Sequence, residues 1–375
     1  MSATTISKTA AQTRTAEQSQ DQLWRTVNMV LAATTTLFLV VYFLAAINFY
    51  NRPFVGAFLT HTGVVTGSLP ASDASWSALE AGLQTNDRIV ALGGNDLTQD
   101  GLTQISANLQ AALASSRIGD EVRLEYERVD DDVCAAGSGD TCQATITLTQ
   151  LSGEDFLTYF MLPYGAAIIM FGIGFLTMRY RSNTRVGLIA AATAFVSAIY
   201  AGGIFDVSTT GILTPIWLAS AFWIGANLIT ISALFPRRLY LIRQYPIAQY
   251  MPLAFATALA GLVIFAYLNP SSAFETQWPQ NATTFSALAL TVAVGLVWIQ
   301  RARATTPMSR DQSNMMFIGF ALMLVPALLW FAGRLFVVQM GTTLGFQFEI
   351  LIPLFIFPNA AIAYSVMQYP RNTDK

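Results

Sequence analysis

The chain has 375 residues, of which 54% are hydrophobic and only 11% are charged, and its mean hydropathy is +0.48. Soluble domains carry about a quarter charged residues, so this composition indicates a membrane protein and excludes an ordinary soluble globular chain. The net charge of −2 hides a partition, because acidic residues concentrate between positions 51 and 155 whereas arginines concentrate in short segments further on.

The N-terminal region predicts a tail followed by a membrane anchor. Residues 1–26 are rich in Thr, Ala, Gln and Ser and contain no apolar run, which favours a disordered cytoplasmic tail. Residues 27–50 are mostly apolar and have the length of a spanning helix, too long for the apolar core of a cleaved signal peptide. We therefore interpret residues 27–50 as an uncleaved signal anchor.

Residues 51–152 have the composition of a soluble α/β domain. Two short extended runs punctuated by glycine come first, followed by a helical turn, a strand that enters a Gly-Gly turn, a longer helix and a β-hairpin. The corresponding stretches are "FVGAFLT", "GVVTGSL", "SWSALEAGL", "DRIVALGG", "LTQDGLTQISANLQAALASS", and the pair "EVRLEYERV" and "QATITLT". In the longer helix, Leu102, Ile105 and Leu109 share one face.

The two cysteines of the chain, Cys134 and Cys142, flank the turn of this hairpin. Paired cysteines in an exported domain commonly form a disulfide, so we predict a Cys134–Cys142 bond; two free thiols are the alternative. Because the closed loop is short, the bond would stabilise the domain by about 2 kcal/mol. Its main effect would be to fix the register of the hairpin.

Residues 153–368 predict a seven-helix membrane bundle. Its apolar runs lie near 157–178, 186–205, 212–235, 251–268, 282–300, 315–338 and 348–367. With the signal anchor they give about eight spans. The fold class expected is therefore an α-helical polytopic membrane protein with one exported α/β domain inserted after the first span.

Arginine placement predicts the orientation. The connections "RYRSNTR", "PRRLYLIR" and "RARATTPMSR" alternate with connections that contain neither Lys nor Arg. Short arginine-rich loops stay in the cytoplasm. We therefore expect a bacterial plasma (inner) membrane protein with both termini in the cytoplasm, residues 369–375 as a short cytoplasmic tail, and residues 51–152 outside.

The stretch "EAGLQTNDRIVALGGNDL" at residues 80–97 resembles the PDZ family, especially the form found in bacterial periplasmic proteases. The shared features are a small helix end, an Asp-Arg before a buried strand, and a glycine turn. Asn86 stands where the family usually has glycine, and Asn also accepts a left-handed backbone. The resemblance extends over residues 51–152.

This resemblance implies a groove for the C-terminus of an exported peptide or protein. In PDZ domains a hydrophobic-Gly-hydrophobic loop receives the terminal carboxylate, and the peptide adds as a strand to the neighbouring sheet edge. The implied peptide-binding residues here are Val55, Gly56, Ala57, Phe58, Leu59 and Thr60, with Leu102, Ile105 and Leu109 as the opposite wall. The alternative is a closed groove in a domain that serves as a spacer on the bundle.

Two charged residues fall within predicted spans, Arg334 and Glu349. They flank the same outer loop, so we predict an intramembrane ion pair between them. Such a pair can hold the last two helices together, or its two side chains can extend to the membrane surface. The other interpretation is a switch element or ligand contact that faces the exported domain.

Several enzyme classes are excluded by residue type. His61 is the single histidine, and Lys8 and Lys375 are the only lysines. These residues provide no His-Glu-x-x-His zinc motif, no phosphoacceptor histidine in the cytoplasm and no retinal-binding lysine. We expect no enzymatic activity, metal, cofactor or nucleic-acid partner.

The last predicted span ends in "PNAAIAY" at residues 358–364, and the fourth is followed by "LFPRRLYLIRQYP". Both resemble the input half of bacterial membrane sensor histidine kinases of the competence quorum-sensing type. The resemblance implies a signal-transducing receptor in the lipid bilayer that acts on a cytoplasmic kinase module or response partner. The kinase half itself is absent.

Three functional classes remain open at this level. The first is a receptor, either free-standing or the sensor portion of a longer protein. The second is a transporter or channel with a PDZ-like capture domain, and the third is a membrane scaffold that does not signal. The sequence leaves open the identity of the ligand and whether the groove is open. Monomer and homodimer are both compatible with it.

Overall fold

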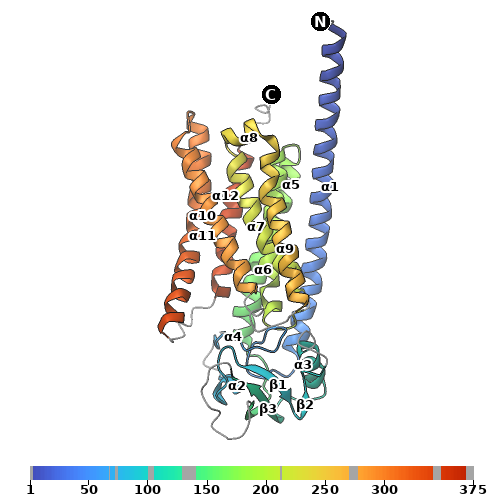
Figure 1. Ribbon diagram of the computed structural model, residues 1–375, viewed down its shortest axis with the longest axis vertical. Coiled ribbons are helices and arrows are strands. Elements are labelled where there is room, and N and C mark those ends of the chain that lie inside the picture. Colours follow the sequence, from blue (N-terminus) through green and yellow to red (C-terminus); the bar gives the residue numbers. More distant parts are fainter. Residues whose placement is uncertain are drawn as a thin grey trace.

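The computed structural model describes residues 3–66, 68–71, 75–99, 105–128, 141–211, 213–269, 278–340 and 348–368. Within these ranges the side chains of residues 3–21, 23–24, 278–281, 326, 329–340 and 348–350 are not described. A bundle of long helices carries a small sheet domain at one end, and both chain termini lie toward the other end (Figure 1). We call residues 51–152 the sheet domain and the helices that follow, together with α1, the bundle.

The long helices match the apolar runs of the sequence. They are α1 (Ala3–Tyr50), α5 (Leu162–Arg181), α6 (Arg185–Val207), α7 (Thr214–Leu234), α9 (Met251–Leu268), α10 (Trp278–Ala302), α11 (Pro307–Met340) and α12 (Ile356–Met367). A short α4 (Gly153–Phe156) and the π-helical η2 (Leu157–Met161) lead into α5. Between α7 and α9 lie α8 (Tyr240–Gln244) and the 3₁₀ helix η3 (Pro246–Tyr250), and a 3₁₀ segment η5 (Phe348–Phe355) precedes α12.

Six helices in the described part are long and apolar enough to cross a membrane. A shorter apolar helix covers Leu351–Met367, and the remaining predicted run lies in α11. The protein is therefore a helical membrane protein, while the count of eight spans stays a prediction. The α1 helix begins at Ala3, so most of the tail that was expected to be disordered is helical. Its Ala and Gln residues favour helix.

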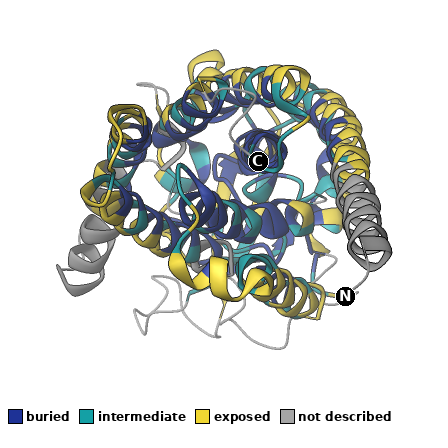
Figure 2. Ribbon diagram, turned by 90° about the horizontal axis from the view of Figure 1, so that it is seen from above, coloured by how far each residue is buried: buried dark blue, intermediate teal, exposed yellow. Residues whose placement is uncertain are grey.

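The central helix of the bundle is α6, in which every residue from Gly187 to Asp206 is buried. It contacts α1, α5, α7 and α12. At Gly202 and Gly203 a Cβ atom would come within 2.9 Å of Leu39 and Trp217 respectively, so small residues let α1 and α7 approach closely. Figure 2 shows the corresponding pattern for the described part of the bundle, with buried residues on the inner faces of the helices and exposed residues on the outer faces.

The sheet domain contains a four-stranded antiparallel sheet in the order β2-β1-β3-β4. Its strands are β1 (Arg88–Leu92), β2 (Asn95–Asp96), β3 (Glu121–Glu127) and β4 (Thr141–Thr147), and its helices are α2 (Ser77–Glu80) and α3 (Ile105–Ala114). The predicted helical turn, strand, longer helix and hairpin are all present. The two extended runs before them form only isolated bridges, Phe54 with Thr149, Leu59 with Val65 and Val64 with Arg88.

The stretch at residues 80–97 has a structural role. Asn86 has a φ of 76°, as expected for a residue in the place of glycine. Asp87 is 2% exposed, accepts a hydrogen bond from the Gln84 N–H at 2.8 Å, and forms an ion pair with Arg128 at 3.2 Å. These bonds hold the turn before β1 and connect it to the end of β3.

The structure describes only one of the two cysteines of the predicted disulfide. Cys142 is buried in β4 opposite Tyr126 of β3, whereas Cys134 lies outside the described residues. The bond between them stays a prediction.

Candidate functional site at the junction of the sheet domain and the bundle

Aromatic residues from both parts of the protein meet where the sheet domain contacts the bundle. The ring of Phe58 lies 5.0 Å from Trp76 in its own domain, 4.9 Å from Tyr159 of η2 and 5.8 Å from Phe205 of α6, measured between centroids. All four side chains are at most 4% exposed. Buried aromatic contacts of this kind contribute both area and preferred edge-to-face geometry, so the domain is docked on the bundle rather than suspended above it.

A buried carboxylate reinforces this docking. Asp155, in α4 at the start of the helix that becomes α5, is completely buried. It accepts hydrogen bonds from the Ala71 N–H at 2.7 Å and from the Trp76 indole N–H at 2.9 Å. Its position in the first turn of a long helix is favourable for a negative charge. Asp155 therefore attaches the segment before α2 to the bundle.

Residues 58–60, which we call the edge segment, lie on the side of the sheet domain that contacts the bundle. The Thr66 N–H donates to the Phe58 carbonyl at 2.9 Å, and the Thr60 N–H donates to the Val64 carbonyl at 2.8 Å. Because backbone groups alternate sides along an extended segment, the backbone groups of Leu59 face away from this pairing. The Leu59 N–H donates to the Ser208 carbonyl at 3.1 Å, which belongs to the connection between α6 and α7.

The same connection also contacts helix α3. The Ser106 hydroxyl donates to the Thr210 carbonyl at 3.1 Å, and the Ser106 N–H donates to the His61 carbonyl at 3.2 Å. The His61 ring lies 3.9 Å from the ring of Tyr267, whose hydroxyl donates to the Gly211 carbonyl at 3.1 Å. Residues 208–211, the α6–α7 connection, thus bond to the edge segment at Leu59 and to α3 at Ser106.

Asp206 holds this connection in shape from the end of α6. It is 2% exposed and accepts hydrogen bonds from the Leu213 N–H at 2.8 Å and the Thr214 hydroxyl at 3.2 Å. The Thr210 hydroxyl donates to its other carboxylate oxygen. Asp206 follows the apolar run of α6, and Asp155 comes just before the run that leads into α5. Neither residue was predicted to have a role, although an acidic residue next to an apolar run is a usable signal.

The expected peptide-binding residues are mostly buried. Four of them have exposed fractions of 2% to 5%: Val55, Ala57, Phe58 and Leu59. Gly56 faces the first residues of α2, and the Thr60 hydroxyl oxygen accepts a hydrogen bond from the Val64 N–H at 3.1 Å.

On the expected opposite wall, Ile105 and Leu109 are buried in the domain core, and Leu102 lies outside the described residues. The structure brings the loop and α3 together around one core. Peptide binding by these residues stays a prediction.

The predicted ion pair lies outside the described side chains. The backbones of Arg334 and Glu349 belong to α11 and η5, but their side chains are not described. Among the residues that the structure describes, no group of three or more His, Cys, Asp or Glu could hold a metal ion.

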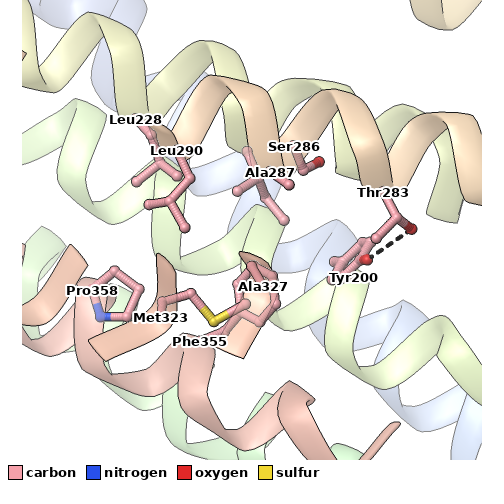
Figure 3. A pocket seen from close by; sticks show the side chains of 11 residues that line it. Tyr200, Leu228, Thr283, Ser286, Ala287, Leu290, Met323, Ala327, Phe355 and Pro358 are labelled. Carbon is pink, nitrogen blue, oxygen red and sulfur yellow. Dashed lines mark hydrogen bonds between the residues drawn. The ribbon is translucent and has the colours of Figure 1, made fainter. Parts of the chain in front are cut away.

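A narrow cavity of about 20 Å³ lies inside the bundle between α6, α7, α10, α11 and α12 (Figure 3). The Tyr200 and Thr283 hydroxyls lie 3.4 Å apart on one side of it, and Ser286 is a further polar residue of the lining. The rest of the lining is apolar, with no charged side chain among the described residues. This chemistry does not favour a path for ions or polar solutes.

Comparisons with known proteins found no matching family model, no similar characterised protein and no similar solved structure. Function is therefore inferred from the junction and from the charge distribution of the bundle.

Proposed function

We propose that this protein is a membrane receptor in signal transduction. Residues 51–152 serve as an extracytoplasmic PDZ-like domain that binds the C-terminus of an exported peptide or protein. The bundle relays binding to a cytoplasmic partner such as a histidine kinase module, and the chain has no enzymatic activity of its own. The observation that carries the proposal is the pair of hydrogen bonds by which Leu59 and Ser106 hold the α6–α7 connection.

These bonds support a coupling between ligand binding and the bundle. A peptide that adds as a strand needs the outward-facing donor of the edge segment, and the Leu59 N–H already donates to Ser208. A bound peptide would have to replace this bond and shift residues 208–211. That connection directly follows α6, the central helix of the bundle, so a ligand would favour a different position of the connection and thereby of the bundle.

The charge distribution supports the proposed orientation. At the end of the bundle opposite the sheet domain, the connections carry the arginines, whereas the α6–α7 connection next to the domain carries none. Positive connections remain in the cytoplasm, which favours an extracytoplasmic sheet domain.

The Asp206→Ala substitution tests the coupling without altering either wall of the groove. Removal of the carboxylate takes away the acceptor that shapes residues 208–214. If the connection competes with peptide, its loosening should raise the apparent affinity for peptides by about tenfold, since the binding-competent fraction increases. The measurement is fluorescence anisotropy with a labelled pool of peptides that have free C-termini, on the full chain in nanodiscs.

Two controls accompany this experiment. Thr193→Ala removes a buried hydroxyl on the same helix, one that donates within α6 to Ile189, and should leave peptide affinity unchanged. Peptides with amidated C-termini should bind neither protein. Equal affinity of Asp206→Ala and the unchanged protein would contradict the coupling, and absence of peptide binding in both would favour the scaffold interpretation.

The proposed signal relay to a cytoplasmic kinase can also be tested from the gene and its neighbours. A kinase domain that continues in frame, or a response regulator encoded beside the gene, is the expected finding. Neighbouring genes for transport components without any two-component partner would count against a signalling role.

A further inference from the structure

A small pocket lies at the end of the bundle opposite the sheet domain, between the start of α6, the end of α7 and the start of α9. Its interior space is about 20 Å³, so a larger group would bind at its mouth, and its lining combines polar and apolar side chains. The polar lining residues are Arg185, Asn227, Thr230, Gln249 and Tyr250, and the apolar ones are Ile189, Leu234 and Leu253. This pocket is separate from the junction and from the groove.

The guanidinium of Arg185 is the charged group of this pocket. One of its terminal nitrogens donates to the Tyr250 hydroxyl, and its carbon lies 5.0 Å from the centre of the Tyr250 ring. Its Nε–H is buried and has no hydrogen-bond partner in the described structure. No carboxylate among the described residues forms a salt bridge with it. A partly buried guanidinium with a free donor is costly unless an anion compensates it.

The surroundings of the pocket do not supply such an anion. Ten arginines with described side chains occupy this end of the bundle: Arg25, Arg179, Arg181, Arg185, Arg237, Arg238, Arg243, Arg301, Arg303 and Arg310. Among the described side chains there, Asp311 is the only acidic one. The excess positive charge attracts anions to this face.

The segment beside the pocket has the character of a membrane-surface element. In α8 and η3, Tyr240 and Ile247 are 76% and 77% exposed, and Leu241 and Tyr245 are also exposed. Aromatic and aliphatic residues next to arginines are typical of the headgroup region of a bilayer. The pocket follows directly in the chain, at Gln249 and Tyr250, and so lies at the level where lipid phosphates are found.

We propose that this pocket binds the phosphate group of an anionic phospholipid. Arg185 would donate its free Nε–H to a phosphate oxygen, and the side-chain amides of Asn227 and Gln249 would supply further donors. The planar arginine fork matches phosphate geometry, and basic pockets between membrane helices on the cytoplasmic side are suited to anionic head groups. The site does not depend on peptide binding by the sheet domain.

The experiment uses the full chain in dodecyl maltoside, titrated separately with phosphatidylglycerol, phosphatidylcholine and inorganic phosphate. Binding is followed by thermophoresis, and the shift in Tm gives a second readout. Phosphatidylglycerol should bind more tightly than phosphatidylcholine. The Arg185→Gln variant should lose about tenfold or more in affinity for phosphatidylglycerol, as expected for a lost charge-assisted hydrogen bond.

Arg243→Gln is the matched control, because it removes the same charge from an exposed position of the same face. It should keep the affinity of the unchanged protein. If Arg185→Gln does not fold, Gln249→Leu removes a donor from the pocket and should also weaken lipid binding.

The outcomes separate the two sources of phosphate. Tight Arg185-dependent binding of phosphatidylglycerol alone supports a lipid site, and equally tight Arg185-dependent binding of inorganic phosphate supports the pocket but assigns it to free phosphate. Absence of binding by the unchanged protein, or equal loss in Arg185→Gln and Arg243→Gln, would overturn the proposal.

Discussion

The Gly56→Ala substitution is expected to lower the free energy of unfolding of the sheet domain by about 2–5 kcal/mol, from left-handed backbone strain and overpacking together. Gly56 has a φ of 81°, which L side chains rarely adopt. A Cβ atom there would lie 2.5 Å from the Ser77 backbone nitrogen and 2.6 Å from that of Ala78. Because these are backbone atoms at the start of α2, the loop itself would have to move.

Gly82→Ala is the matched control for backbone strain alone. Gly82 has a φ of 94°, but a Cβ atom there would have nothing within 4 Å. We expect a loss of only about 1–2 kcal/mol for this variant. Denaturant unfolding of the full chain in detergent, followed by protease sensitivity of the sheet domain, measures both. Equal destabilisation by the two variants would show that the contact with α2 is unimportant.

The tight packing around Gly56 also limits which substitutions can test peptide binding. A bulky residue at position 56 would disrupt the loop against α2, so a loss of peptide binding would report misfolding and ligand contact alike. Asp206→Ala avoids the difficulty because Asp206 is not one of the expected peptide-binding residues and acts on the connection to which Leu59 bonds.

Local patterns in the sequence predicted most elements of the sheet domain correctly. The alternation in "EVRLEYERV" and "QATITLT" predicted β3 and β4, and the glycine pair after "DRIVAL" predicted the turn after β1. The runs "FVGAFLT" and "GVVTGSL" are extended but form only isolated bridges. Residues 63–65 bond to the start of β1, whereas Leu59 bonds to the bundle and His61 to α3. A local pattern cannot distinguish these partners.

The junction could not be predicted in the same way, because its contacts join residues far apart in the chain. Leu59 bonds to Ser208, and Asp155 bonds to Trp76. Phe58 was expected to line a peptide groove, yet its ring is buried against Tyr159 and Phe205. A hydrophobic residue beside a glycine suits both surroundings, so hydrophobicity alone did not distinguish a ligand surface from a docking surface.

The Asp155→Ala substitution is expected to weaken the docking of the sheet domain on the bundle by about 3–5 kcal/mol, since two hydrogen bonds to a charged acceptor are lost. The Ala71 N–H and the Trp76 indole N–H would be left without this acceptor, the latter in a buried site. Hydrogen–deuterium exchange of the full chain in nanodiscs should show faster exchange at residues 68–71 and in α2.

Two neighbouring variants separate the role of the acceptor from that of the charge. Asp155→Asn keeps one carbonyl oxygen as an acceptor and should give an intermediate effect, whereas Glu154→Ala removes an exposed carboxylate from the same turn and should change stability by less than about 0.5 kcal/mol. Exchange in Asp155→Ala no faster than in Glu154→Ala would contradict the assignment. If the assignment holds, Asp155→Ala should also reduce the effect of bound peptide on exchange in α6, because a loosely docked domain transmits less of its binding energy to the bundle.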